Sequence, residues 1–243
     1  MNAMTLPWQI PGHVEPIDLS TKRHSLFRGL TTRQKAIALG AFTQDVYGDG
    51  DPIPRSRASA PHPEIALRGV LRKEVAEPGG ASRLFGLTFA GEILSPAGPR
   101  TAAVQYIAMG ETVLLSCDAD AFAELVEEIP RLRMNYLEEL QDRLCEARRG
   151  QIMLGRKTAM QRVATLLLSF WERQGRPVEM DLRLNRAELG QILCLTLETV
   201  SRQIKVLEKA GTVALPQPSR VIIRDPQSLL AATGEPVSLR RAA

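Results

Sequence analysis

The chain has 243 residues, of which 44% are hydrophobic and 24% charged, and its formal net charge at pH 7 is +4. A chain of this length can bury one or two sizeable cores, so we expect two domains. No apolar run reaches the roughly 18 residues that span a bilayer, and the N-terminal residues lack the apolar core of a signal peptide. We therefore expect a cytoplasmic protein without a membrane partner.

The positive charge is concentrated in the C-terminal part. Residues 156–243 hold 14 Lys and Arg against 8 Asp and Glu, whereas residues 1–155 hold 17 against 19. A cationic surface gains affinity for duplex DNA by releasing condensed counterions. This part of the chain is therefore a candidate for DNA binding that weakens steeply with salt.

The reactive side chains argue against an enzyme. The three histidines are scattered, whereas a metal site inside a β-roll needs about three converging histidine or carboxylate ligands. We find no Ser/His/Asp set, glycine-rich phosphate loop or Cys-x-x-Cys pair. The three cysteines, at positions 117, 145 and 194, form neither a disulfide framework nor a zinc motif. We therefore expect no catalysis, no metal and no cofactor.

The N-terminal half divides into a tail and a β-rich region. Residues 1–24 are rich in proline and predict a flexible tail, in which we expect His13 and His24 to be surface residues. Residues 25–129 predict an antiparallel β-roll, because strand patterns separated by Gly- and Pro-rich turns favour a small roll or barrel. Its three best strand candidates are residues 65–75, 83–94 and 102–115.

Residues 130–155 predict one long helix that begins at Pro130, a residue well suited to a helix start. Along this helix, alternating steps of three and four residues define a narrow heptad seam flanked by charges. The seam predicts a homodimer interface, and the alternative is an amphipathic helix that lies on its own domain. The seam residues are Leu137, Leu140, Leu144, Ala147, Gln151 and Leu154.

Residues 156–243 predict a winged helix-turn-helix domain. Asn185 and Glu188 have the spacing of a capping box at the start of a short helix. A turn at residues 194–195 leads to Thr196, which can cap a second helix that ends at Gly211. Residues 213–215 and 221–223 predict the hairpin of the wing. The second helix is expected to place four apolar side chains inward: Leu197, Val200, Ile204 and Leu207.

The opposite face of this second helix carries a polar stripe of Glu198, Ser201, Arg202 and Lys205. The stripe alone could be ordinary solvated surface, with Glu198 and Arg202 forming a helix-stabilising pair worth about 0.2–0.5 kcal/mol. The preceding short helix and tight turn favour another interpretation. Together these elements form the arrangement that inserts a recognition helix into the DNA major groove.

The stretch LGQILCLTLETVSRQIKVLEKAG resembles the DNA-binding signature of the Crp/Fnr family of bacterial transcription regulators. Glu198 and Arg202 match the family's base-reading residues, and with Ser201 they form the E-x-x-S-R pattern of the FNR and FixK branch. The segments LFRGL and LGRKTAMQRVATLLL are similar to the helical segment before the family's roll and to its hinge. The resemblance implies an α+β fold with an N-terminal cyclic-nucleotide-binding-like β-roll, a long dimerisation helix and a C-terminal winged helix-turn-helix.

The resemblance also implies roles for individual residues. Arg202 would donate to guanine, Glu198 would accept from the amino group of cytosine or adenine, and Ser201 would contact thymine in a TTGAT-type inverted repeat. The expected partners are palindromic double-stranded DNA, a second copy of the chain and RNA polymerase, and the expected role is activation of low-oxygen or redox-linked genes. Residues expected at DNA phosphates are Arg186, Thr196, Thr199 and, in the wing, Arg220.

The chain departs from two sensing chemistries of the family. It lacks the N-terminal cysteines that hold the iron-sulfur cluster of FNR. Gly91-Glu92 and Arg100-Thr101 resemble the pairs that bind cAMP, but their spacing is shorter than the family's. We therefore expect a turn with solvated charges at these positions and no cAMP binding.

Cys194 occupies the turn between the two predicted helices, where many family members have glycine. It is either a small buried apolar residue or a redox-sensitive thiol, since some FixK-type proteins are similar in having a cysteine near this position. Cys117 and Cys145 are expected to be packing residues.

Two further alternatives remain for the whole chain. The roll could bind haem or another small molecule as an effector, or the chain could be a nucleotide-binding interaction module whose helix-turn-helix contacts protein.

Overall fold

The computed structural model describes residues 24–54, 63–77, 79–94 and 104–235. The tail before His24, including His13, and the pair Arg100-Thr101 lie outside these residues. In the described part of the chain, no helix is both long and apolar enough to cross a membrane.

An antiparallel sheet forms the N-terminal part, after the 3-10 helix η2 (Ser25–Phe27) and helix α1 (Thr32–Gly40). The sheet order is β1-β5-β2-β3, and β4 pairs with β2. The pairing of β2 with β5 shifts register on either side of Arg68. Such irregularities bend a strand and increase its twist, which curves the sheet into a roll. The strands are β1 (Phe42–Tyr47), β2 (Glu64–Ala76), β3 (Ser82–Phe89), β4 (Glu92–Ile93) and β5 (Val104–Cys117).

Strands lie at all three predicted positions, with two differences, and residues 102 and 103 of the third candidate lie outside the described part of the chain. The candidate at residues 83–94 is divided by a turn at Gly91 into β3 and β4. The other difference is β1, which pairs with β5 along its whole length and was not among the strand candidates. Its sequence, FTQDVY, has weak alternation, and its strand conformation depends on the ladder that β5 offers.

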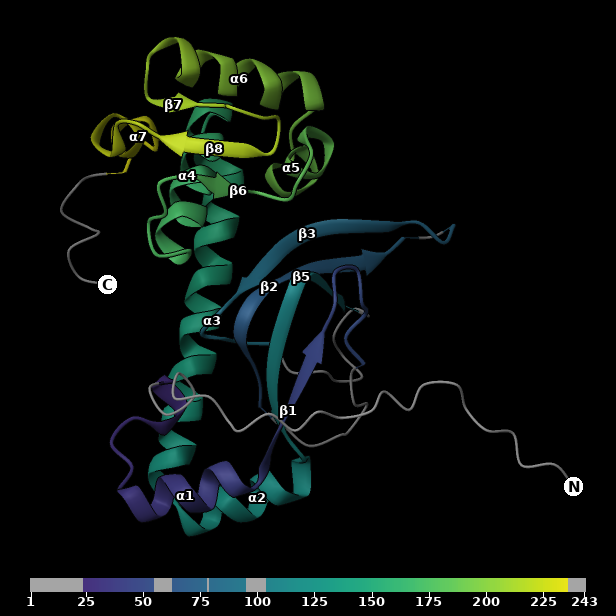
Figure 1. Cartoon of the computed structure of the whole chain (residues 1–243), viewed down its shortest axis with the longest axis vertical. Coiled ribbons are helices and arrows are strands. Elements are labelled where there is room, and N and C mark those ends of the chain that lie inside the picture. Colours follow the sequence, from purple (N-terminus) through teal and green to yellow (C-terminus); the bar gives the residue numbers. More distant parts are fainter. Residues whose placement is uncertain (1–23, 55–62, 78, 95–103, 236–243) are drawn as a thin grey trace, which may run out of the picture.

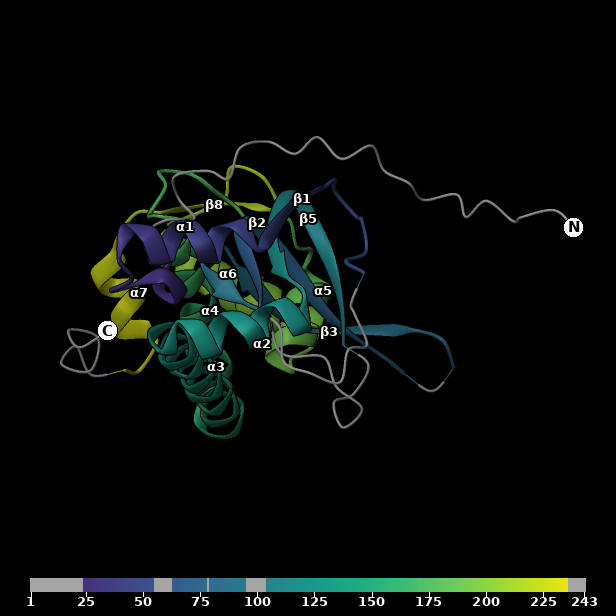
Figure 2. The same cartoon turned by 90° about the horizontal axis from the view of Figure 1, so that it is seen from below.

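Two helices lead away from the roll. Helix α2 (Ala119–Glu128) is capped by Asp118, and helix α3 (Pro130–Arg156) begins with the predicted proline and runs for 27 residues. Figure 1 shows α3 passing along the roll, from α1 and α2 at one end of the molecule to α4 (Ala159–Arg173) at the other. Figure 2 shows α3 at the edge of the molecule, so that one side of this helix is left uncovered by the rest of the chain.

The C-terminal part is a winged helix-turn-helix, as predicted. The two helices of the motif are α5 (Arg186–Leu193) and α6 (Leu197–Lys209), and Figure 1 shows α6 at the end of the molecule remote from α1 and α2. A three-stranded sheet of order β6-β8-β7 supports them. The remaining elements are β6 (Met180–Asp181), β7 (Val213–Ala214), β8 (Arg220–Ile223) and α7 (Pro226–Ala232), which Asp225 caps.

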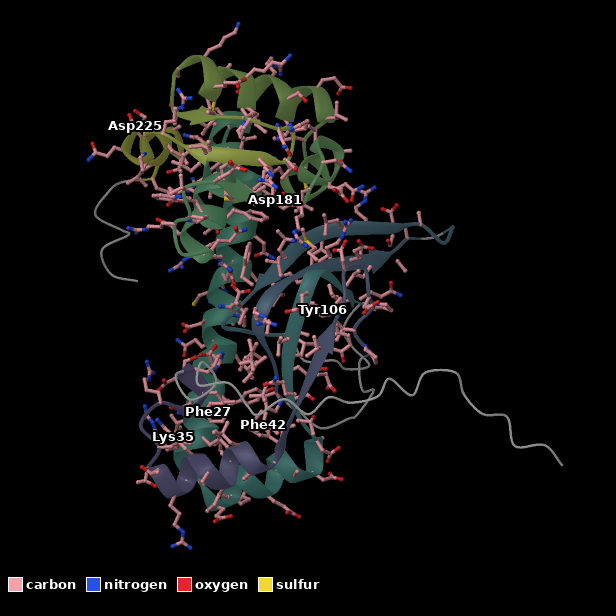
Figure 3. All side chains as sticks on the ribbon, in the orientation of Figure 1. Phe27, Lys35, Phe42, Tyr106, Asp181 and Asp225 are labelled. Atoms are coloured by element: carbon pink, nitrogen blue, oxygen red, sulfur yellow. The ribbon has the colours of Figure 1, made fainter. Side chains whose placement is uncertain are left out.

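The buried apolar side chains of the described residues form three clusters, and the two largest lie at opposite ends of the molecule. At the N-terminal end, the rings of Phe27 and Phe42 pack edge to face with centroids 5.5 Å apart (Figure 3). The C-terminal core is continuous with the roll, because it also contains Leu84, Leu87 and Phe89 of β3. The roll therefore packs directly against the helix-turn-helix part.

His24 is not the surface residue that the sequence predicted, because it is only 8% exposed. Its Nδ1 accepts a hydrogen bond from the Leu26 backbone N–H at 3.1 Å, and its Nε2 lies 3.1 Å from the Gly91 carbonyl oxygen, to which it can donate. Burial lowers the pKa of His24, which favours the neutral ring. The side chain thus caps η2 and ties it to the turn before β4.

Glu92 also differs from the prediction of a solvated turn, since it is 7% exposed. Its carboxylate accepts from the Phe89 backbone N–H at 3.1 Å and pairs with Arg143 of α3 at 3.0 Å. It also pairs with Arg173 of α4, which in turn pairs with Glu146 of α3. Glu92, of the Gly91-Glu92 pair, therefore joins the roll to α3 and α4.

The two helical glycines Gly190 and Gly150 have opposite surroundings. A Cβ at Gly190 would lie 2.5 Å from the Leu195 carbonyl oxygen, whereas a Cβ at Gly150 would have no heavy atom within 4 Å. Overpacking costs about 1–3 kcal/mol, and alanine in an open helical position gains about 1 kcal/mol over glycine. We expect Gly190→Ala to lower the free energy of unfolding by roughly 1 kcal/mol or more and Gly150→Ala to raise it. Urea unfolding followed by circular dichroism measures both, and equal stabilisation by the two variants would contradict the tight turn.

Candidate nucleic-acid interface

The start of the helix-turn-helix is fixed by the predicted capping box. The Asn185 side chain accepts from the backbone N–H groups of Ala187 and Glu188 at 2.9 and 3.0 Å. In return, the Glu188 carboxylate accepts from the Asn185 backbone N–H at 2.8 Å. Glu188 also pairs with Arg72 of β2 at 2.7 Å. The Glu188 carboxylate thus caps the N-terminus of α5 and also attaches this helix to the roll.

The turn after α5 forms at Cys194, which has a left-handed backbone (φ 51°, ψ 50°). Cysteine is an unusual residue for this conformation, which glycine adopts without steric cost. Cys194 is exposed, which contradicts the first of the two alternatives, a small buried apolar residue. Cys117, in contrast, is buried as predicted. Its burial and, to a smaller extent, the negative charge of Asp118 raise the pKa of its thiol to about 11. Cys145 is half-buried.

Helix α6 is anchored by one apolar face. Thr196 caps the helix by accepting from the Thr199 backbone N–H at 3.2 Å. Val200, Ile204 and Leu207 are buried, and the helix packs against α4 and α5. The expectation that Leu197 also points inward is wrong, because this residue is 47% exposed. Leu197 is the first residue of α6, and its side chain projects past the core that begins at Val200.

The opposite face of α6 presents the predicted base-reading residues to solvent. Glu198, Arg202 and Lys205 are exposed, and Ser201 is half-buried. Hydrogen bonds from its own backbone N–H and from the Thr196 hydroxyl lower the pKa of Glu198, so its carboxylate is ionised at neutral pH. Within the described residues, no ion pair joins Glu198 to Arg202. The carboxylate is therefore available as an acceptor and the guanidinium as a donor.

The residues predicted at phosphates are less uniform. Thr196 is exposed, and its hydroxyl oxygen lies 3.1 Å from the Thr199 hydroxyl oxygen. Arg220 is exposed but pairs with Glu179 at 2.6 Å, which raises its pKa. Arg186 is half-buried, and burial lowers its pKa although the charge of Glu208 partly offsets this effect. A DNA phosphate would have to compete with Glu179 for Arg220, and Arg186 would have to become more exposed to reach one.

The predicted seam on α3 is only partly solvent-facing. Leu137 and Leu144 are each 51% exposed, and Ala147 and Gln151 are also exposed. Leu140 and Leu154 are half-buried, and Leu140 packs against the N-terminal core of its own chain. Two exposed apolar residues of α3 were missing from the predicted seam, Met134 and Ile152. The alternating steps would place Arg133 before Leu137, so the strict pattern misses Met134, which lies three residues before Leu137.

Comparisons with known proteins agree with this architecture. Residues 161–232 match the model of the Crp-like helix-turn-helix domain. The transcriptional activator protein FnrL of Cereibacter sphaeroides is 33% identical over 165 residues, which cover 64% of this chain and 66% of FnrL, slightly less than two thirds. The nitrogen fixation regulation protein FixK of Azorhizobium caulinodans is 40% identical over 91 residues, or 35% of this chain and 37% of FixK.

The solved structure of FixK2 from Bradyrhizobium japonicum has the same fold. It superposes with a TM-score of 0.69 at 22% identity, covering 81% of this chain and 99% of that chain. The α+β architecture, the matched helix-turn-helix domain and the sequence relatives lead to one conclusion. Residues 161–232 belong to the Crp-like helix-turn-helix domain family, and the chain as a whole is similar to the FnrL and FixK regulators.

Proposed function

We propose that this protein is a sequence-specific DNA-binding transcription regulator that acts as a homodimer on a TTGAT-type inverted repeat. One observation carries the proposal: α6 buries Val200, Ile204 and Leu207 and leaves Glu198, Ser201 and Arg202 on the opposite, outward face. A helix held in this way can insert its outward face into the major groove, while the helices that it packs against stay outside the groove.

The chemistry of the exposed face supports direct base reading. The Arg202 guanidinium offers a planar pair of donors that matches the O6 and N7 acceptors of guanine. The ionised Glu198 accepts from the amino group of a cytosine or adenine nearby, and Ser201 contacts the neighbouring thymine. The TTGAT-type half-site itself comes from the resemblance of the E-x-x-S-R pattern to the FNR and FixK branch.

Contacts to phosphates would fix the register of the helix without specifying sequence. Thr196 and Thr199 lie at the N-terminus of α6, where the helix dipole and free backbone N–H groups favour an anion. Arg220 can exchange Glu179 for a phosphate because both of these side chains are exposed to water. Arg186 is the weakest of the four candidates, because it would have to leave its half-buried position beside Glu208.

A homodimer is supported by the uncovered side of α3. Exposed apolar side chains recur along this helix at Met134, Leu137, Leu144 and Ile152, and solvent exposure of such a stripe is unfavourable. Pairing two copies of α3 would bury the stripe and would generate a two-fold axis. Paired recognition helices about one turn of DNA apart, roughly 34 Å, require such symmetry.

The proposed role is activation of low-oxygen or redox-linked genes through RNA polymerase in the cytoplasm. The similarity to FnrL, a transcriptional activator, and to FixK, a nitrogen fixation regulation protein, supports regulation of this kind. The absence of cAMP binding stays a prediction, supported by the engagement of the Glu92 carboxylate with Arg143 and Arg173. A haem or small-molecule effector, and a nucleotide-binding interaction module, stay as alternatives.

The base-reading assignment is tested by Arg202→Ala. A bidentate arginine–guanine contact is worth about 1–3 kcal/mol of discrimination, so the variant should lose most of the preference for the G·C pair that Arg202 reads. Fluorescence anisotropy with the operator and with a duplex changed at that pair measures this preference. The matched control is Lys205→Ala, which removes one charge from the same face and should weaken binding to both duplexes equally. A variant without Arg202 that still rejects the changed pair as strongly as wild type would remove the assignment.

The dimer is tested by replacing Leu137 and Leu144 together with Glu. Two carboxylates in the paired seam would repel their counterparts, so the double variant should sediment as a monomer and lose affinity for the palindrome. The control is Val178→Glu, which places one carboxylate at an apolar residue that is 86% exposed and lies outside α3. Analytical ultracentrifugation distinguishes the species, and a double variant that remains dimeric would argue against this interface.

The exposed position of Cys194 supports a redox-sensitive thiol at the DNA-facing turn. Oxidation by peroxide to a sulfinate would add negative charge next to the DNA phosphates. Peroxide should therefore weaken operator binding by the wild type, whereas Cys194→Ser and Cys194→Ala should resist it. Cys145→Ser, at the half-buried cysteine, should keep the sensitivity. The same loss of binding in all four proteins would rule out this role for Cys194.

A further inference from the structure

Arg162, in the first turns of α4, lies outside the outward face of α6 and makes three hydrogen bonds to backbone carbonyl groups. Its Nη2 donates to the Leu154 carbonyl oxygen at 2.6 Å, and its Nε donates to the Lys157 carbonyl oxygen at 3.0 Å. Its Nη1 donates to the Leu193 carbonyl oxygen, also at 3.0 Å. A single half-buried guanidinium therefore joins three backbone positions that are up to 39 residues apart in the chain.

All three acceptors lie at the ends of helices. Leu154 is in the last turn of α3, Lys157 follows that helix directly, and Leu193 is the last residue of α5. Carbonyl groups in the last turn of a helix have no partner within the helix. The backbone N–H of Thr158, which would bond Leu154 if α3 continued, instead donates to the Gln161 side chain in the capping box of α4. Arg162 thus supplies the donor that the end of α3 lacks.

The position of Leu193 connects this arrangement to the recognition helix. Cys194 in its left-handed conformation follows directly, and α6 begins only three residues later, at Leu197. The fork of an arginine is planar and holds its donors in fixed directions. The end of α3 and the end of α5 therefore cannot rotate against each other without breaking at least one of these bonds.

We infer that Arg162 is a positioning residue that sets the distance and angle between the two recognition helices of the dimer. The inference rests on the proposed function, because it assumes that α3 pairs about a two-fold axis. In that arrangement the path from the axis to the DNA runs from α3 through Arg162 to Leu193, and from there through the turn into α6. The other end of α4 is held separately, by Arg173 with Glu92 and Glu146. With that end fixed, Arg162 determines the angle at the hinge.

The role is tested first without DNA, by measuring the distance between the two protomers at the exposed Cys194. A spin label on Cys194 in a Cys145→Ser background reports this distance by pulsed electron paramagnetic resonance, since Cys117 is buried. We expect a narrow distance distribution when Arg162 is present and a broad one for Arg162→Lys and Arg162→Gln. Equally narrow distributions in all three proteins would overturn the inference, and this result would not depend on whether the protein binds DNA.

The second measurement uses the full-length chain and three palindromes with identical half-sites whose centres are set at the optimal spacing and one base pair closer or farther. Wild type should prefer the optimal spacing, and Arg162→Lys should lose about tenfold affinity there, roughly 1.4 kcal/mol. Its affinity for the other two spacings should change by no more than about twofold on the same scale. Lysine keeps the positive charge, so counterion release is unaltered.

The matched control is Arg224→Lys, at an exposed arginine of the same part of the chain, which should leave all three affinities unchanged. Arg162→Lys that loses affinity by the same factor on all three palindromes would show a general structural effect and overturn the positioning role. If wild type itself fails to prefer a palindrome over a scrambled duplex, the proposed DNA-binding function fails, and the distance measurement still decides the role of Arg162. A melting curve by circular dichroism confirms that each variant is folded.

Discussion

The structure depends on the attachment of α6 through a single apolar face. Val200, Ile204 and Leu207 are nearly inaccessible to solvent, and burial of such side chains stabilises a protein by about 1.5–3 kcal/mol each. This attachment determines which face of α6 remains exposed to solvent. The residues on that remaining face, Glu198 and Arg202, can then act on a partner without any cost to the core.

The contacts between the roll and the helix-turn-helix part determine where α6 lies relative to the rest of the molecule. The roll holds the helix-turn-helix part by an apolar contact of β3 with the C-terminal core and by charged pairs at Arg72 with Glu188 and at Glu92 with Arg173. Ion pairs with little exposure contribute less to net stability than to geometry, because desolvation offsets much of their attraction. The removal of one partner, however, leaves an unpaired charge and is strongly destabilising. These pairs therefore favour one relative arrangement of the two parts.

Local sequence signals predicted the helix-turn-helix in detail. The capping box at Asn185, the turn at Cys194 and the cap at Thr196 depend on residues within a few positions of one another, and each was found where the pattern placed it. The fold class followed from the same signals together with the family resemblance. The side chains that reach solvent on α6 were also predictable, because helical periodicity decides them, except at Leu197 on the first turn.

The features that sequence reasoning missed depend on contacts between distant segments. His24 is hydrogen-bonded to the Gly91 carbonyl oxygen. Glu92 pairs with Arg143 and Arg173, which lie 51 and 81 positions after it in the chain. Strand β1 requires its ladder with β5, and Arg162 requires the meeting of two helix ends. Helical or strand periodicity contains no information about such partners. The phosphate candidates show the same limit, since spacing cannot reveal that Arg220 already pairs with Glu179.

The most direct measurement is equilibrium binding of the full chain to a TTGAT-type palindrome and to a scrambled duplex of the same composition, combined with the stoichiometry from sedimentation. The account predicts two chains per palindrome, an affinity at least about 10³-fold tighter than for the scrambled duplex, and a steep loss of affinity with added salt. Equal affinity for the two duplexes, or one chain per duplex at saturation, would contradict it.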